Sequence, residues 1–371
     1  MKKIKKIKLS ALDLIHIAHL KVIKDDLPFR MAIRATLLNV EYTSETKSLM
    51  NAVVGMELTH HLLFSYLISK DFGDVSVEEL SLLSIVLSNS LFSKKIDNEL
   101  LLKFTIKKLR EYGSEIDEKQ IEEFVNKHSD LKTIIGEEIP KGSLEYLELR
   151  YNTPKWVIKM WQKQFGKALT YQILRANLHQ QKNTVRVNTL SASKEEVMKR
   201  DEGLFSLTEL DNVLYVNDKK RLRESLSYEL YDIFPLSLGM KDALDDVSVD
   251  SMKPIAIFQG SPGEKLFLEV MMKVGRSVKM DLILQGEKDY HEIKNNINKY
   301  GLDKTKLYIS SPKEVVTCIS EPVSTFFVLP ESSNLEQIRL SPDYLLHFKS
   351  SSLDEIIANQ KLLLNLVIDL G

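Results

Sequence analysis

The sequence contains a single cysteine, Cys318, in 371 residues. One cysteine excludes an internal disulfide and a zinc site built from cysteines. No stretch reaches the roughly 18 consecutive apolar residues of a membrane helix. The N-terminal MKKIKKIKLS also lacks the apolar run of a signal peptide. We therefore expect a cytoplasmic protein with no membrane partner.

The sequence also has almost no net charge, and its formal value at pH 7 is -1. The charge is unevenly distributed, since residues 150–200 contain eleven lysines and arginines but only two acids, Glu195 and Glu196. Such a local excess in a near-neutral chain is typical of a segment that binds a polyanion. The alternative, a solvated helix face, stays open at this point.

Apolar residues recur three and four apart from Ser10 to about Pro140, which predicts helices, and no segment there alternates convincingly as a strand. Ser76 and Asp117 are suitable N-caps for two of these helices. We expect an all-α domain over residues 1–140. His60 and His61 are adjacent and so cannot form an i, i+4 metal pair; we assign them structural roles and predict no metal site.

A small α+β region is expected over residues 141–250. The phrase RYNTPKWVIKMWQKQFG predicts a helix capped by Thr153 with Pro154 in its first turn. Its apolar stripe is surrounded by lysines and comprises Trp156, Val157, Met160 and Trp161. TVRVNTL and LDNVLYVND read as strands, and SASKEEVMKR between them reads as a helix.

Strands alternate with helices from residue 251 to 371, with IAIF, VKMDLIL, KLYIS and STFFVL as the strands. This rhythm predicts a parallel, doubly wound, Rossmann-like sheet. Only four strands are visible, so we expect the sheet to be incomplete. In such folds a cofactor binds beyond the carboxyl ends of the strands.

The order of these parts resembles the RsmB (Sun) family of 16S rRNA cytosine-5 methyltransferases. The resemblance rests on the helical first domain, RYNTPKW, VRVNTL and the turn SPGEK. It implies a NusB-like RNA-binding domain over 1–140, a small RNA-binding region over 141–250 and a truncated S-adenosylmethionine methyltransferase domain over 251–371.

The family's first cofactor motif resembles D-x-C-A-A-P-G-G-K. Three residues stand at matching places, namely Pro262, Gly263 and Lys265. Others depart from the motif: Ile257 takes the aspartate position, Gln259 the cysteine position and Glu264 the place of the second glycine. Both the missing carboxylate and the added one act against binding of the cofactor.

The other cofactor positions are also altered. An acid should end the second strand, where counting from either side gives Leu284 or Asp281, and we favour loss of the acid. The family's G-D-A near the third strand is replaced by Ser310, Ser311 and Pro312. The expected remnant of the site is therefore Pro262, Gly263, Lys265 and Asp281, with no cofactor bound, or S-adenosylmethionine if the site works.

The catalytic motif, which resembles D-A-P-C-S, reads VLPESS here, so Glu331 or Ser332 replaces the cysteine. The family's attacking cysteine lies in a T-C-S segment on a later strand, and this chain ends at Gly371 without it. Cys318 falls on the predicted helix before the fourth strand, where we expect a structural thiol. We predict no catalytic residue, because addition to cytosine needs a thiolate.

Our hypothesis is a non-catalytic protein that binds RNA, ribosomal in kind. The RNA contacts are expected from Arg150, Lys155, Trp156, Lys159, Lys163, Arg175, Arg186 and Asn188, with Tyr171 as a second aromatic. One alternative is an active methyltransferase that takes its missing strands and cysteine from another chain. Another is a protein-interaction module, in which a partner covers the exposed sheet edge.

Overall fold

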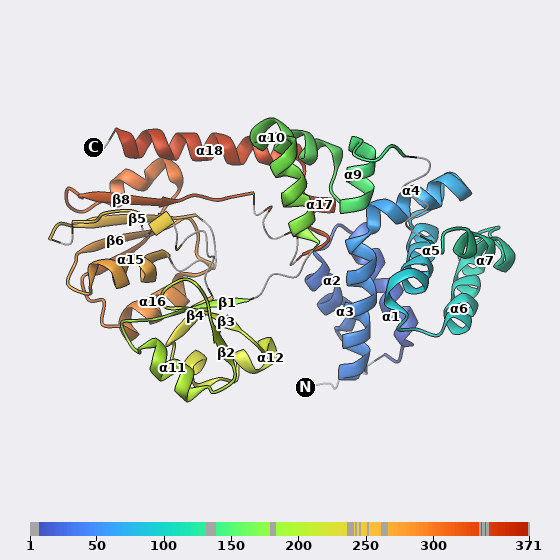
Figure 1. Cartoon of the computed structure of the whole chain (residues 1–371), viewed down its shortest axis with the longest axis horizontal. Coiled ribbons are helices and arrows are strands. Elements are labelled where there is room, and N and C mark those ends of the chain that lie inside the picture. The colour runs from blue at the N-terminus through green and yellow to red at the C-terminus, as the bar shows by residue number, and fades with distance from the viewer. Residues whose placement is uncertain are drawn as a thin grey trace. The chain divides into compact units, whose positions relative to one another are not determined.

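The computed structural model describes residues 7–130, 139–178, 183–235, 241, 243–244, 246–250, 252–260, 266–333, 335, 338 and 341–369. The chain forms two compact units (Figure 1). One comprises Met1–Gln180 and Asn334–Ser350, and the other Gln181–Ser333 and Ser351–Gly371. These divisions differ from the boundaries expected near residues 140 and 250.

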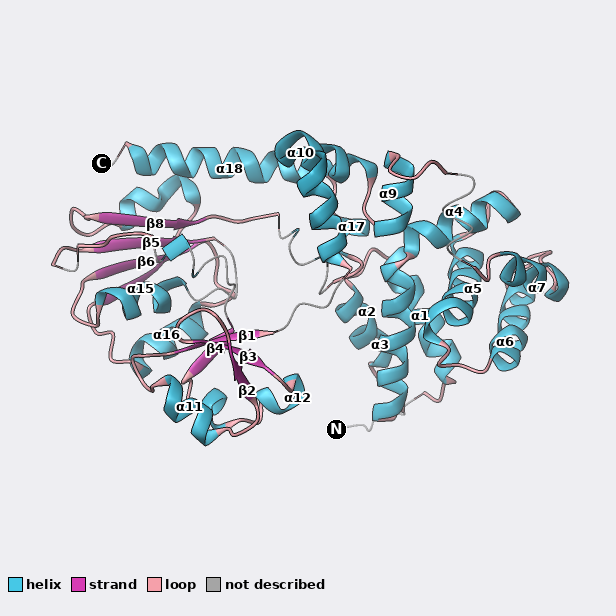
Figure 2. Ribbon diagram, in the orientation of Figure 1, coloured by secondary structure: helices cyan, strands magenta, loops and turns pink. Residues whose placement is uncertain are grey.

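The first unit is helical (Figure 2). Its elements are α1 (Ala11–Ile23), α2 (Phe29–Leu37), α3 (Ser44–Thr59), α4 (His61–Phe72), α5 (Val77–Ser88), the π-helical turn η1 (Asn89–Ser93), α6 (Asn98–Glu111), α7 (Glu118–Lys127), α9 (Leu144–Tyr151), α10 (Lys155–Asn177) and α17 (Tyr344–His347). Among the described residues, no single helix is long and apolar enough to cross a membrane. The pair α4 and α5–η1 meets that test only together, and it is bent by 111°.

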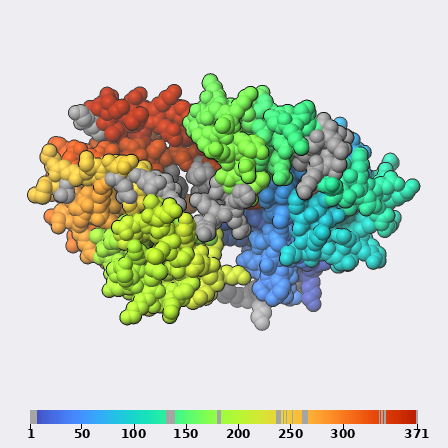
Figure 3. Space-filling model, viewed as in Figure 1, coloured from blue at the N-terminus to red at the C-terminus, as the bar shows by residue number. Residues whose placement is uncertain are grey.

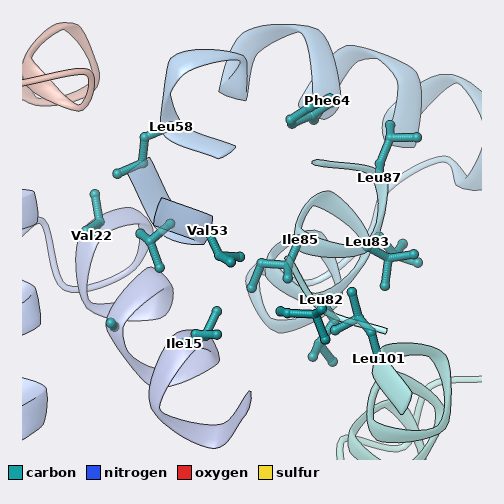
Figure 4. Close-up of a cluster of buried hydrophobic side chains, with 14 of the residues drawn as sticks. Ile15, Val22, Val53, Leu58, Phe64, Leu82, Leu83, Ile85, Leu87 and Leu101 are labelled. Atoms are coloured by element: carbon teal, nitrogen blue, oxygen red, sulfur yellow. The ribbon is translucent and has the colours of Figure 1, made fainter. Parts of the chain in front are cut away.

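The core of this unit lies between α1, α3, α4, α5 and α6 (Figure 4). Large side chains such as Phe64, Leu58 and Leu82 are fully buried there. Ser76 and Asp117 cap α5 and α7, each within a reciprocal capping box. Both predicted N-caps are therefore confirmed.

The helices α9 and α10 pack with residues from a distant part of the chain. Val157, Ile158 and Trp161 of α10 are buried in one cluster with Leu345 of α17. This packing explains why residues 141–180 join the helical unit. The predicted cap at Thr153 is wrong: its hydroxyl donates to the carbonyl of Tyr151, and Pro154 takes the N-cap position without a side-chain bond.

Two side chains of the 341–348 segment fasten it to the helical core. Asp343 accepts a hydrogen bond of 2.8 Å from the backbone N–H of Phe29, which is the first residue of α2. His347 Nδ1 lies 2.5 Å from a carboxylate oxygen of Asp26, and its Nε2 lies 3.4 Å from Asp343. The hydrogen bond to Asp343, followed by that to Asp26, raises the pKa of His347 despite its partial burial.

The contacts of His347 with Asp26 and Asp343 predict that the stability of the fold depends on pH. A histidine with a raised pKa stabilises the fold fully below its unfolded value of 6.5, and the contribution disappears as the pH rises through the folded pKa. We expect His347→Asn to lower the free energy of unfolding at about pH 6 and to have progressively less effect above neutrality. Urea denaturation across this range checks it, and a difference that grows with pH would contradict it.

The second unit begins with a small antiparallel sheet of order β2-β3-β1-β4. Its strands are β1 (Thr184–Val187), β2 (Phe205–Leu207), β3 (Val213–Val216) and β4 (Ile233–Pro235), with helices α11 (Lys194–Arg200), α12 (Lys219–Leu222) and α13 (Leu226–Glu229). β1, α11 and β3 lie where the sequence predicted two strands and a helix. β2 and β4, of three residues each, were too short to show a period.

A four-stranded parallel sheet of order β7-β6-β5-β8 follows (Figure 2). Its strands are β5 (Ile255–Gln259), β6 (Met280–Leu284), β7 (Thr305–Ile309) and β8 (Thr325–Leu329). Its helices are α15 (Leu266–Val274), α16 (Tyr290–Lys299), the 3-10 helix η2 (Pro312–Cys318) and α18 (Ser350–Ile368). The multidomain fold predicted from the sequence, with four strands in the Rossmann-like part, is confirmed.

Candidate nucleic-acid interface and cofactor crevice

The helix α10 carries a row of polar and basic side chains that are four residues apart, and the row is interrupted by a break in the helix at Gly166. Residues four apart lie on one face of a helix. From the start of α10 the row comprises Lys155, Lys159, Lys163, Lys167, Tyr171 and Arg175, all of them exposed. No aspartate or glutamate occurs between residues 155 and 177. Figure 3 shows this segment, in green, open to solvent.

Gly166 divides α10 into two helical pieces. Its φ of 75° and ψ of 168° lie in a region that is essentially restricted to glycine. Lys167 was missing from the predicted contacts, although its position four residues after Lys163 could have indicated it. Of the predicted contacts, Arg150 is also exposed, whereas Lys155 is engaged by Glu148 at 3.2 Å.

The aromatic residues near this row differ in availability. Trp156 is half-buried, and its ring stacks on Phe348 with centroids 6.1 Å apart. Tyr171 is 44 % exposed and meets Tyr151 edge-on at 5.9 Å. Phe165, beside the break at Gly166, is 41 % exposed. Tyr171 and Phe165 can therefore offer a ring face to a base, and Trp156 mainly packs within the protein.

Arg186 and Asn188 do not lie at a nucleic-acid surface in this structure. Arg186 is only 7 % exposed, and its Nε donates to both carboxylate oxygens of Glu269, at 3.0 and 3.1 Å. Asn188 is fully buried and donates to the carbonyl of Tyr231. We therefore withdraw the prediction that these two residues contact RNA. Their side chains bind Glu269 and the backbone of Tyr231 inside the protein.

The register of the parallel strands shows which residue of β6 lies at the carboxyl edge of the sheet, where the family resemblance places the cofactor. Gln259, Leu284 and Leu329 are aligned as the last residues of β5, β6 and β8. Asp281 lies at the opposite end, where its carboxylate accepts hydrogen bonds from the N–H and hydroxyl of Ser320. Asp281 is therefore not the ribose-binding acid, and Leu284 occupies that place.

Other groups approach the backbone closely at Gly260, directly after β5. A Cβ atom there would lie 2.6 Å from the side-chain oxygen of Gln285 and 2.6 Å from the backbone nitrogen of Glu331. The family motif has alanine at this position, so the space of its methyl group is filled here. Gln360 of α18 fixes the neighbouring segment by donating to the carbonyl of Glu331. Sequence reasoning missed both glutamines because no motif marks them.

Several positions of the family motifs lie outside the described residues. These are Pro262, Gly263, Glu264 and Lys265 of the first motif. Ile257, at the aspartate position, is fully buried within β5. The described part of the crevice therefore shows no carboxylate from β5 or from the end of β6.

Cys318 ends η2, two residues before Ser320, and six residues separate it from β8. Because Ser320 binds Asp281 near the amino end of β6, this segment reaches the edge of the sheet opposite the crevice. The thiol packs against a cluster that includes Phe258 and Leu363. The thiol therefore lies in hydrophobic packing and does not stand at either cysteine position of the family motifs.

Residues 153–202 match the family model of the ferredoxin-like domain of RsmF/B-like methyltransferases. This segment is similar to the RsmF/B-like ferredoxin-like domain. The predicted resemblance to the RsmB family is thereby confirmed. The RsmF/B-like segment includes α10, β1 and α11. None of the curated proteins compared with the chain is similar enough to match.

Solved structures share the fold at low sequence identity. The crystal structure of PH0851 has a TM-score of 0.69 and 15 % identity, covering 97 % of this chain and 83 % of that chain. A methyltransferase homolog protein from Pyrococcus horikoshii has a TM-score of 0.50 and 14 % identity, covering 62 % and 73 %. The chain as a whole therefore has a multidomain methyltransferase-like fold.

Proposed function

We propose that this protein is a non-catalytic relative of the RsmB-type methyltransferases that binds RNA, ribosomal in kind, in the cytoplasm. The observation that carries the proposal is the exposed basic row of α10. Five lysines and arginines lie on this helix with no acid between residues 155 and 177. Its RsmF/B-like match supports a role in contact with RNA.

The contacts to phosphate are assigned to Arg150, Lys159, Lys163, Lys167 and Arg175, which are exposed. Arg150 belongs to α9, and the other four belong to the two pieces of α10 on either side of Gly166. Each offers a cation to a phosphate of the RNA backbone. Tyr171 and Phe165 supply ring faces for unpaired bases, because stacking needs no particular base. A single-stranded region of RNA is therefore the preferred ligand of this surface.

Loss of cofactor binding and of catalysis is the second half of the proposal. Its support is the missing carboxylate at Ile257 and Leu284, the filled space at Gly260 and the position of Cys318. An active enzyme completed by another chain remains the competing function. Detectable methyl transfer would favour it.

Binding of labelled single-stranded RNA should fall steeply with salt. Each phosphate contact contributes a slope of about -0.7 in log affinity against log salt, so four or five contacts give roughly -3. We expect the triple variant Lys159→Glu, Lys163→Glu and Lys167→Glu to bind far more weakly. We expect Tyr171→Ala to cost about 1 to 3 kcal/mol of binding with an unchanged slope. Fluorescence anisotropy at several salt concentrations measures both.

The matched control reverses the same number of charges elsewhere on the helical unit, with Lys47→Glu, Lys107→Glu and Lys119→Glu. These lysines are exposed and lie on α3, α6 and α7. The control should retain most of the affinity. Equal losses in both triple variants, or binding that is insensitive to salt, would mean that α10 is only a solvated face.

A further inference from the structure

A chain of polar side chains runs through the core of the helical unit. It starts at the half-exposed Tyr112 and ends at His61, the first residue of α4. The successive pairs are Tyr112 with His16 at 3.1 Å, His16 with Ser81 at 3.0 Å, Ser81 with His19 at 2.9 Å, His19 with Glu57, and Glu57 with His61 at 2.8 Å. The proposed function uses none of these residues.

Three members of this chain converge on one point. His19 comes from α1, Glu57 from the last turn of α3 and His61 from the start of α4. His19 and Glu57 are fully buried, and His61 is 8 % exposed. One nitrogen or oxygen from each lies within 4.8 Å of the others. Three separate helices thus place two imidazoles around one carboxylate.

We propose that His19, Glu57 and His61 form a binding site for a zinc ion. Two imidazole nitrogens and a carboxylate are a donor set that suits Zn²⁺. His19 Nε2, His61 Nδ1 and one oxygen of Glu57 supply three donor atoms, and a water molecule would complete the usual four. Zinc bound there would join α1, α3 and α4 of the helical core.

The charge of the cluster supports a cation. Both oxygens of Glu57 meet imidazole nitrogens, one of them His19 Nε2 and the other His61 Nδ1. The carboxyl lies inside a core that contains Leu58 and Phe64. Metal ligation requires neutral imidazoles and an ionised carboxylate, and a divalent cation then supplies the counter-charge that a buried carboxylate needs.

The outer residues can serve as a second shell. Burial lowers the pKa of His16 to about 4, so its ring is neutral at neutral pH, with one donor and one acceptor nitrogen. With zinc on His19 Nε2, the Nδ1–H of His19 donates to Ser81, whose hydroxyl donates to His16 Nδ1. The Nε2–H of His16 then donates to the hydroxyl of Tyr112. Each donor from His19 to His16 thus has an acceptor. Hydrogen-bond partners of this kind fix the orientation of a metal-binding histidine.

The sequence pattern did not reveal this site. His60 and His61 are adjacent in the sequence and do not form a pair. The local partner of His61 is Glu57, four residues earlier. The second imidazole of the cluster comes from His19 on α1. His60 is directed elsewhere and stacks on Phe92 with centroids 4.0 Å apart. The prediction of no metal site is therefore replaced by this proposal.

The test uses the full chain, purified without a histidine tag and freed of metal with a chelator. We expect one zinc per chain by elemental analysis after zinc is restored, and a rise in melting temperature. Cobalt(II) should give the intense visible absorption of a tetrahedral site. Glu57→Gln and His61→Gln should abolish the one-to-one binding, and Ser81→Ala should weaken it about 10- to 100-fold.

His128→Gln is the matched control. It removes another buried histidine of this unit, which pairs with Asp71 at 2.7 Å, and it should bind zinc as the parent does. A folded parent chain that takes up neither zinc nor cobalt at one-to-one stoichiometry would overturn the proposal, whether or not the variants fold. Unchanged binding in a folded Glu57→Gln variant would overturn it as well.

Discussion

Replacing Arg186 with methionine should lower the free energy of unfolding of the second unit by about 3 to 5 kcal/mol. The reason is that the variant leaves the buried carboxylate of Glu269 without the guanidinium that binds it. Glu269 is 5 % exposed and receives Arg186 Nε through both carboxylate oxygens. The guanidinium also donates to the backbone carbonyl of Asn212, at 3.0 Å. Without it, the carboxylate stays buried and loses this charged partner.

The double variant Arg186→Met with Glu269→Leu separates this cause from a general loss of packing. Replacing both partners of a buried ion pair by apolar residues is often nearly neutral, so most of the stability should return. Arg175→Met, on the exposed face of α10, serves as the control and should change stability by less than about 0.5 kcal/mol. Urea denaturation measures all three. A loss below about 1 kcal/mol for Arg186→Met would contradict the argument.

The fold was predictable where its elements are long and periodic. The helices from Ser10 onward show apolar spacing, and their starts at Ser76 and Asp117 carry reciprocal caps. The four parallel strands are short apolar runs separated by helices. The boundaries between the units were harder to predict, because α10 joins the helical unit through contacts with residues almost 200 positions later, such as Leu345. Local sequence carries no sign of such contacts.

The candidate site was predictable in part. The row of lysines on α10 follows from spacing alone, so its exposed members could be named from the sequence. Arg186 is also basic and lies in the same segment, but its carboxylate partner is 83 residues away on α15. A count of charges cannot tell a free cation from a buried one. The His19–Glu57–His61 cluster was invisible for the same reason, since three helices must meet before it exists.

The cofactor crevice explains why the largest loss is expected in affinity for S-adenosylmethionine. The family's acidic positions hold Ile257 inside β5, Leu284 at the end of β6 and Ser311 after β7. None of these side chains offers a carboxylate to an ammonium or to the ribose hydroxyls. In addition, Gln285 and the backbone of Glu331 fill the space beside Gly260. The losses act at separate points of the cofactor and therefore accumulate.

Two or three missing charge-assisted hydrogen bonds, at about 1.5 to 3 kcal/mol each, weaken binding by roughly two to six orders of magnitude. Calorimetric titration of the full chain with S-adenosylmethionine should therefore give no saturable heat at micromolar concentrations. RNA binding by the same preparation shows that the protein is folded and competent. A micromolar dissociation constant would contradict the prediction. So would methyl transfer to unmodified small-subunit rRNA that Cys318→Ala abolishes, because it would require a thiol that packs in a hydrophobic cluster to act as the nucleophile.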